Sequence, residues 1–171
     1  CGGFQMLGET LSDPEGVEEG GFLNGMGLLP MDTVFKSNKT RTRVEGKFGQ
    51  VDGILKGLSG VSVAGYEIHM GISEKKEDSL SASFLTQIKS VSELKLDGMT
   101  KNNIYGSYIH GIFDKEQVVR TIVQSLAKEK GLDMGEIAVM DYEQYKEVQY
   151  DILADTLRQH LDMKKIYEIL E

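Results

Sequence analysis

The sequence has few of the residues that build cross-links, metal clusters or nucleic-acid surfaces. One cysteine among 171 residues excludes a disulfide within the chain and indicates a reducing compartment. The three histidines lie far apart and form no zinc-binding spacing with that cysteine, so no metal site is expected. An excess of 27 acidic over 19 basic residues gives a net charge of −8, which disfavours binding to a nucleic acid.

Long apolar runs and phosphate-binding motifs are missing as well. No stretch approaches the roughly 18–20 apolar residues of a membrane span, and none resembles the apolar part of a signal peptide. These absences predict a cytoplasmic protein without a membrane partner. No G-x-x-x-x-G-K-[ST] sequence occurs, so no cofactor is expected in this chain. The composition, 40% hydrophobic and 27% charged, is that of an ordinary globular protein.

The hydrophobic pattern predicts a short opening helix, then strands, then helices. The helix is expected from Phe4 to Leu11, with turn residues after it. Strands are expected at 33–35, in one or two pieces within 40–55, at 61–70, at 83–88 and at 104–109. Later helices are expected at 115–130, 141–160 and 163–170. This order indicates an α/β architecture.

Cys1 is followed by Gly2, Gly3 and the predicted opening helix. A nucleophile on a sharp turn into a helix needs small neighbours, and the free N–H groups of the helix start favour a thiolate. The backbone N–H of Gly2 would then be able to donate to an oxyanion. A glycine-rich cap with an incidental cysteine explains the same three residues, so the motif alone leaves both interpretations open.

His110 follows a predicted strand and precedes Gly111, which indicates a side chain that faces a site. An imidazole within hydrogen-bond reach of a thiol can serve as its base, whatever the separation in sequence. A structural, hydrogen-bonded histidine is the alternative for His110 and for His69. His160 lies in a polar helix and is expected at the surface.

Five segments, in order, resemble the class I (triad-type) glutamine amidotransferases, in particular the branch found in cobyric acid synthases. They are Cys-Gly-Gly-Phe-Gln-Met-Leu-Gly at 1–8, Gly-Leu-Leu-Pro at 27–30, Gly-Tyr-Glu-Ile-His-Met-Gly at 65–71, Gly-Ser-Tyr-Ile-His-Gly-Ile-Phe-Asp at 106–114, and Asp-Ile-Leu-Ala-Asp-Thr-Leu-Arg at 151–158. Together they span nearly the whole chain. The resemblance implies an α/β, flavodoxin-like fold with a mixed, mostly parallel sheet flanked by helices.

The resemblance also implies roles for individual residues. Cys1 matches the nucleophile of the family, His110 its histidine, and Gln5 a residue that contacts the glutamine substrate. Three residues match the segment whose backbone receives the amino-acid end of glutamine, although they also suit a core strand: Glu67, Ile68 and His69. Ile112 stands where many members carry a glutamate that orients the imidazole, so a Cys–His dyad is expected.

In cobyric acid synthases, the ammonia released from glutamine passes to a domain that uses ATP and Mg. That domain amidates carboxylates of a corrin precursor in cobalamin biosynthesis. Because no phosphate-binding motif occurs here, we expect that domain, and the first part of the amidotransferase domain, to lie outside these 171 residues. We therefore interpret 1–171 as a partial glutamine amidotransferase domain with 141–171 as a helical tail. Little glutaminase activity is expected from the chain by itself.

Other interpretations fit some of the same residues. In class II amidotransferases an N-terminal cysteine is the nucleophile, but the predicted helix after Cys1 and an unused His110 disfavour that class. Cobyrinic acid a,c-diamide synthases and the amidotransferase of lipid II are the alternative class I branches. The fragment could also be an inactive binding module that keeps the fold without turnover.

Overall fold

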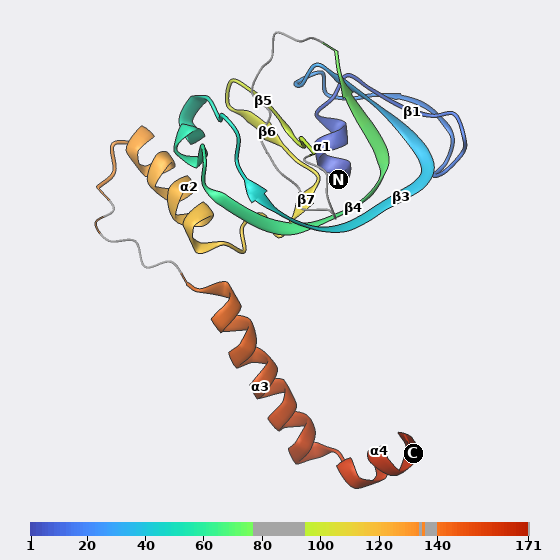
Figure 1. The fold of residues 1–171 in the computed structure, drawn as a ribbon, viewed down its shortest axis with the longest axis vertical. Helices are drawn as coiled ribbons and strands as arrows, with labels where there is room; N and C mark the ends of the chain where they lie inside the picture. The colour runs from blue at the N-terminus through green and yellow to red at the C-terminus, as the bar shows by residue number, and fades with distance from the viewer. Residues whose placement is uncertain (77–94, 134, 136–139, 171) are drawn as a thin grey trace. The chain divides into compact units, whose positions relative to one another are not determined.

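The chain forms two compact units, residues 1–137 and residues 138–171. The computed structural model describes residues 1–76, 95–133, 135 and 140–170 (Figure 1). The strand predicted at 83–88 lies outside the described residues. Within the described part, no helix combines the length and the apolar character needed to cross a bilayer. All residues predicted to form the site belong to the first unit.

The first unit contains a mixed sheet flanked by helices. Its five strands follow the order β2-β1-β3-β4-β7. Their bounds are Thr10–Asp13 (β1), Gly21–Asn24 (β2), Met31–Lys47 (β3), Ser62–Lys75 (β4) and Ile109–His110 (β7). The predicted α/β class is confirmed, but the described sheet is mostly antiparallel, because only β1 and β3 pair in parallel. β3 and β4 are consecutive strands of this sheet and pair antiparallel, from Met31 opposite Lys75 to Lys47 opposite Ser62.

β3 and β4 form a long curved hairpin, with 17 and 14 residues respectively (Figure 1). Their pairing shifts register between Phe35 and Thr40. This irregularity explains why the sequence predicted separate strands at 33–35 and 40–55, since a bulge breaks the alternation without ending the strand. The last residues of the second predicted strand instead form the short 3-10 helix η1 (Gly53–Leu58), which begins at a glycine with φ of +68°.

The opening helix is shorter than the sequence predicted. α1 covers Gly2–Met6, and Leu11 lies in β1 instead of on the same helix face as Phe4. Gly8 explains the early end of the helix. A Cβ there would lie 2.7 Å from the carbonyl oxygen of Met31, so the chain passes close to the backbone of β3 at this point.

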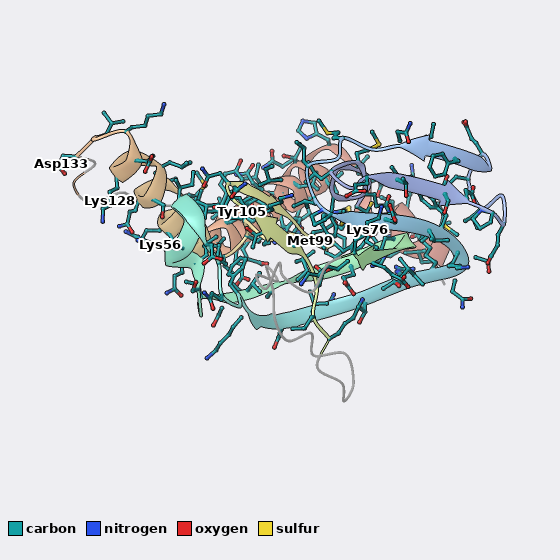
Figure 2. The ribbon with its side chains drawn as sticks, turned by 90° about the horizontal axis from the view of Figure 1, so that it is seen from above. Lys56, Lys76, Met99, Tyr105, Lys128 and Asp133 are labelled. Atoms are coloured by element: carbon teal, nitrogen blue, oxygen red, sulfur yellow. The ribbon has the colours of Figure 1, made fainter. Side chains whose placement is uncertain are left out.

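The strand predicted at 104–109 is divided between two sheets. Its first half is β6 (Ile104–Gly106), which pairs with β5 (Met99–Lys101) as a separate hairpin. Met99 and Tyr105, labelled in Figure 2, lie on these two paired strands. The last residue of the predicted strand, Ile109, belongs to β7 and joins the main sheet. The break at 107–108 is where the chain passes from one sheet to the other.

Two clusters of buried apolar side chains fill the first unit. One lies where η1 and α2 (Glu116–Glu129) cover the sheet, and includes Phe48, Leu58 and Val118, each at most 2% exposed. The other packs against α1 and consists of Phe4, Leu29, Met31, Met99 and Tyr108. Burial of each large apolar side chain is worth roughly 1.5–3 kcal/mol. The second cluster therefore holds α1 firmly against the segment that leads into β7.

The second unit consists of two helices, α3 (Tyr142–His160) and α4 (Met163–Leu170). Their bounds agree with the predicted helices at 141–160 and 163–170. Asp141 caps α3, because its carboxylate accepts the backbone N–H groups of Glu143 and Gln144 at 3.0 and 3.1 Å. No described side chain of either helix is buried.

Candidate active site

Cys1 occupies the N-cap position of α1 and is exposed. Its carbonyl accepts the backbone N–H of Gln5 at 3.0 Å. The first N–H groups of a helix have no partner inside the helix, which leaves that of Gly2 available to an oxyanion. Apart from the adjoining residues and the nearby backbone of α1 itself, no described atom lies within 4 Å of a Cβ built at Gly2 or Gly3. Close packing around these two glycines is therefore not observed among the described residues.

His110 lies in β7, directly opposite Tyr66 of β4. The two rings are stacked, with centroids 5.0 Å apart and an interplanar angle of 10°. A Cβ at Gly65 would overlap the carbonyl oxygen of His110, so only glycine lets β7 approach β4 this closely. Gly111 then leaves the strand with φ of +75°. Two glycines and a tyrosine thus fix the place of the imidazole.

The imidazole of His110 is partly exposed, but one of its nitrogen atoms is shielded from solvent. Its Nε2 is buried and has no hydrogen-bond partner among the described residues. Burial lowers the pKa of His110. A neutral imidazole at neutral pH is able to accept a proton from a thiol. The contacts of Tyr108 with Phe4 and Gln5 join the helix that begins after Cys1 to the segment that leads into β7.

Ile112 and Asp114, which follow His110 in the sequence, stand where a third group that orients the imidazole would be expected. Ile112 packs against the apolar cluster under α2. The backbone N–H of Asp114 donates to the carbonyl of Gly111 at 2.9 Å, and a carboxylate oxygen lies 3.2 Å from where a Gly111 Cβ would be. Within the described residues, no carboxylate is hydrogen-bonded to the imidazole.

Glu67, Ile68 and His69 alternate across β4, so their side chains do not share one surface. Glu67 and His69 are 1% and 8% exposed. Lys95 Nζ lies 3.3 Å from each carboxylate oxygen of Glu67, and His69 Nε2 lies 3.8 Å from one of them. Burial alone would raise the pKa of Glu67, but His69 and Lys95 hold it below its usual value. Glu67 is therefore an ionised, paired carboxylate of the interior.

Gln5 is buried, with 5% of its surface exposed. Its Nε2 donates to the hydroxyl of Tyr108 at 3.2 Å. A Cβ at Gly71 of β4 would overlap the same amide group. A contact between Gln5 and glutamine stays a prediction, because in this structure the amide is turned into the interior.

The sequence did not reveal a set of buried polar side chains next to His110. The hydroxyl of Tyr108 is hydrogen-bonded to that of Ser73 at 2.6 Å. Asp97 accepts the hydroxyl of Ser107 at 2.8 Å and the backbone N–H of Tyr108 at 3.0 Å. Burial raises the pKa of both Asp97 and Tyr108. The nearness of Tyr108 to His110 in the sequence was the single local signal for this network.

A cavity of about 550 Å³ opens beside these polar side chains. Its wall includes His69, Ser73, Asp97 and Tyr108. Neither Cys1 nor His110 contributes to that wall, so the cavity alone does not place a substrate at the thiol. In the part of the chain that the structure describes, no group of three or more His, Cys, Asp or Glu side chains could hold a metal ion.

Comparison with known proteins gives a consistent result over the whole chain. The profile of the family described as the CobB/CobQ-like glutamine amidotransferase domain matches residues 1–118. A cobyric acid synthase from Ruminiclostridium cellulolyticum is 49% identical over 172 residues, which are 100% of this chain and 34% of that protein. The cobyric acid synthase from Lachnoclostridium phytofermentans is 46% identical, and the match covers 100% of this chain and 35% of that protein. The one from a Thermoanaerobacter species is 38% identical, and the match covers 100% of this chain and 34% of that protein. The chain thus spans about a third of the length of these curated relatives.

Proposed function

The chain belongs to the family of CobB/CobQ-like glutamine amidotransferase domains, and we propose that its site releases ammonia from the side-chain amide of glutamine. One observation carries this proposal. The residues that match the family profile include both Cys1 and His110, and Tyr108 contacts Phe4 and Gln5, which joins the helix that begins after Cys1 to the segment that leads into the strand of His110. A thiol and a neutral imidazole that lie together are the groups that nucleophilic attack on an amide requires.

In the proposed reaction, His110 takes the proton of the Cys1 thiol and the thiolate attacks the amide carbon of glutamine. The backbone N–H of Gly2 donates to the oxyanion that forms. The imidazolium returns its proton to the amide nitrogen, so ammonia leaves and a γ-glutamyl thioester remains on Cys1. Water, deprotonated by His110, then hydrolyses the thioester. The sum of the steps converts glutamine and water into glutamate and ammonia.

We assign the amino-acid end of glutamine to the backbone of residues 67–69. Support comes from the pairing of Tyr66 with His110 and of Glu67 with Ile109, because this part of β4 lies beside the strand that carries the base. A contact with the Gln5 amide would require that amide to leave the hydroxyl of Tyr108. Glutamine is therefore held mainly by backbone groups in this proposal.

The larger activity is proposed from the relatives. In a cobyric acid synthase, the ammonia would serve an ATP- and Mg-dependent amidation of corrin carboxylates, carried out by a domain outside these 171 residues. The names of the relatives, at 38–49% identity across the whole chain, support this branch over the other class I branches. A binding module without turnover is the second candidate function. Labelling of Cys1 distinguishes the two candidates, because only an active site is expected to react with a glutamine analogue.

The test is labelling of a full-length protein that contains these 171 residues with a diazoketone analogue of glutamine, followed by peptide mass spectrometry. We expect the label on Cys1, a slower reaction when glutamine is present, and no protection by asparagine, which is one methylene shorter. His110→Asn should slow labelling on the order of a hundredfold, the lower end of what a general base contributes. Labelling that glutamine does not slow, or that His110→Asn leaves unchanged, overturns the proposal.

A further inference from the structure

Tyr108 lies between the helix that begins after Cys1 and the strand that carries His110. Its hydroxyl accepts a hydrogen bond from Gln5 Nε2 at 3.2 Å. Its ring meets the ring of Phe4 edge-on, with centroids 5.0 Å apart. Both of these partners belong to α1. One buried side chain, 5% exposed, therefore touches α1 twice while its own backbone leads directly into β7.

The position of Tyr108 is fixed from two further sides. A carboxylate oxygen of Asp97 accepts the Tyr108 backbone N–H at 3.0 Å and the Ser107 hydroxyl at 2.8 Å. The Ser107 oxygen in turn accepts the backbone N–H of Ile109 at 2.9 Å. The tyrosine hydroxyl also meets Ser73 of β4 at 2.6 Å. Asp97 is 7% exposed, so the loss of one partner leaves polar groups unsatisfied in the interior.

We propose that Asp97 and Tyr108 are positioning residues that set the distance between the Cys1 thiol and the His110 imidazole. This inference rests on the proposed glutamine chemistry of Cys1 and His110. Asp97 holds the backbone that leads into β7, and Tyr108 ties that backbone to α1. Proton transfer needs the thiol and the imidazole within about 2.6–3.2 Å, and a misplacement of about 1 Å can cost roughly a hundredfold in rate.

Tyr108→Phe tests the link to α1 with the least disturbance. The change removes the hydrogen bonds to Gln5 and Ser73 but keeps the ring that packs against Phe4. It alters no charged side chain, so the electrostatic surroundings of His110 stay the same. Tyr105→Phe is the matched control, because the Tyr105 hydroxyl donates to the Asp52 carbonyl at 2.9 Å and accepts the backbone N–H of Leu55 at 3.4 Å, two partners outside α1.

Asp97→Ala and Asp97→Asn test the backbone anchor. Alanine removes the acceptor of the Ser107 hydroxyl and the Tyr108 N–H, whereas the asparagine side chain still offers one oxygen to both. Rescue by asparagine therefore distinguishes loss of the hydrogen bonds from loss of the negative charge. Thermal melting curves of every variant identify the temperature range in which the unit remains folded.

The measurement is the alkylation rate of Cys1 by iodoacetamide as a function of pH, for each folded variant and for His110→Asn. We expect Tyr108→Phe and Asp97→Ala to slow the reaction near neutral pH on the order of tenfold and to move the profile toward that of His110→Asn. Tyr105→Phe and Asp97→Asn should keep the profile of the unmodified chain.

Two outcomes separate failure of this inference from failure of the proposed function. If His110→Asn changes the profile and Tyr108→Phe does not, Asp97 and Tyr108 do not position the pair, while the Cys1–His110 chemistry stands. If His110→Asn leaves the profile unchanged, the proposed function fails and this inference fails with it. A Tyr108→Phe variant that melts earlier but keeps its profile shows a purely structural role, which also overturns the inference.

Discussion

Replacement of Gly65 by alanine is expected to disturb stability and the site together. A Cβ at this position overlaps the carbonyl oxygen of His110 and lies 2.8 Å from a side-chain carbon of Ile109. The carbonyl oxygen belongs to the backbone of β7 and cannot rotate away, so β7 must move away from β4. Overpacking of this kind typically costs 1–3 kcal/mol, and we expect about 3 kcal/mol for Gly65→Ala because a strand must shift.

Urea unfolding followed by near-ultraviolet circular dichroism, which reports on packed tyrosines such as Tyr108, measures this loss. With a slope of about 2 kcal/mol per molar urea, the midpoint should fall by roughly 1.5 M. Gly3→Ala is the matched control, because its Cβ meets no described atom within 4 Å in a helix. It should stabilise the chain by about 0.4–1 kcal/mol. A Gly65→Ala midpoint equal to that of the unmodified chain refutes the account of how β7 is placed.

Three further variants test the electrostatics and hydrogen bonding of the first unit. The pKa of Asp97 is higher in the folded chain than in the unfolded chain. Protonated Asp97 therefore stabilises the fold below the unfolded pKa, and this stabilisation is lost as pH rises through the folded pKa. Asp97→Asn cannot ionise and so does not lose stability in this way. The free energy of unfolding of Asp97→Asn relative to the unmodified chain should therefore grow as pH rises above about 4, and a difference that does not change with pH contradicts this. The pKa of Glu67 is lower in the folded chain, so the stabilisation from its pairing with Lys95 is present above the unfolded pKa and is lost as pH falls. Lys95→Met should lower the free energy of unfolding by about 1 kcal/mol or less at pH 7, because Lys95 is half exposed. The loss should be smaller still in acid. Asp13→Ala removes the acceptor of three loop N–H groups, so hydrogen exchange at Val17, Glu18 and Gly20 should accelerate; unchanged exchange contradicts this role.

The helices of the second half of the chain were predictable from the sequence. α2, α3 and α4 follow the apolar period of a helix and have local end signals, such as Asp141 at the N-cap of α3 and Gly131 after α2. The short strands were not predictable. β2 and β5 have four and three residues, and each exists because of its partner strand, which local patterns do not identify.

The candidate site divides in the same way. Cys1 and His110 could be proposed from short motifs, because a thiol at a helix start and a histidine between a strand and a glycine have local signatures. The hydrogen bond between Gln5 and Tyr108 joins residues that are 103 positions apart, so no local pattern predicts it. Glu67 was expected near glutamine, and its pairing with Lys95 in the interior becomes visible only in the folded unit.

In the proposed reaction Cys1 attacks glutamine with the help of His110, and the covalent intermediate that results can be captured. A full-length protein that contains these 171 residues is incubated with glutamine, quenched in acid and digested for mass spectrometry. We expect a mass increase equal to glutamine minus ammonia on the peptide that contains Cys1, and its loss in Cys1→Ala and in His110→Asn. If Cys1 of the folded protein gains no such adduct, or gains it equally without His110, then Cys1 and His110 are not the pair that attacks glutamine.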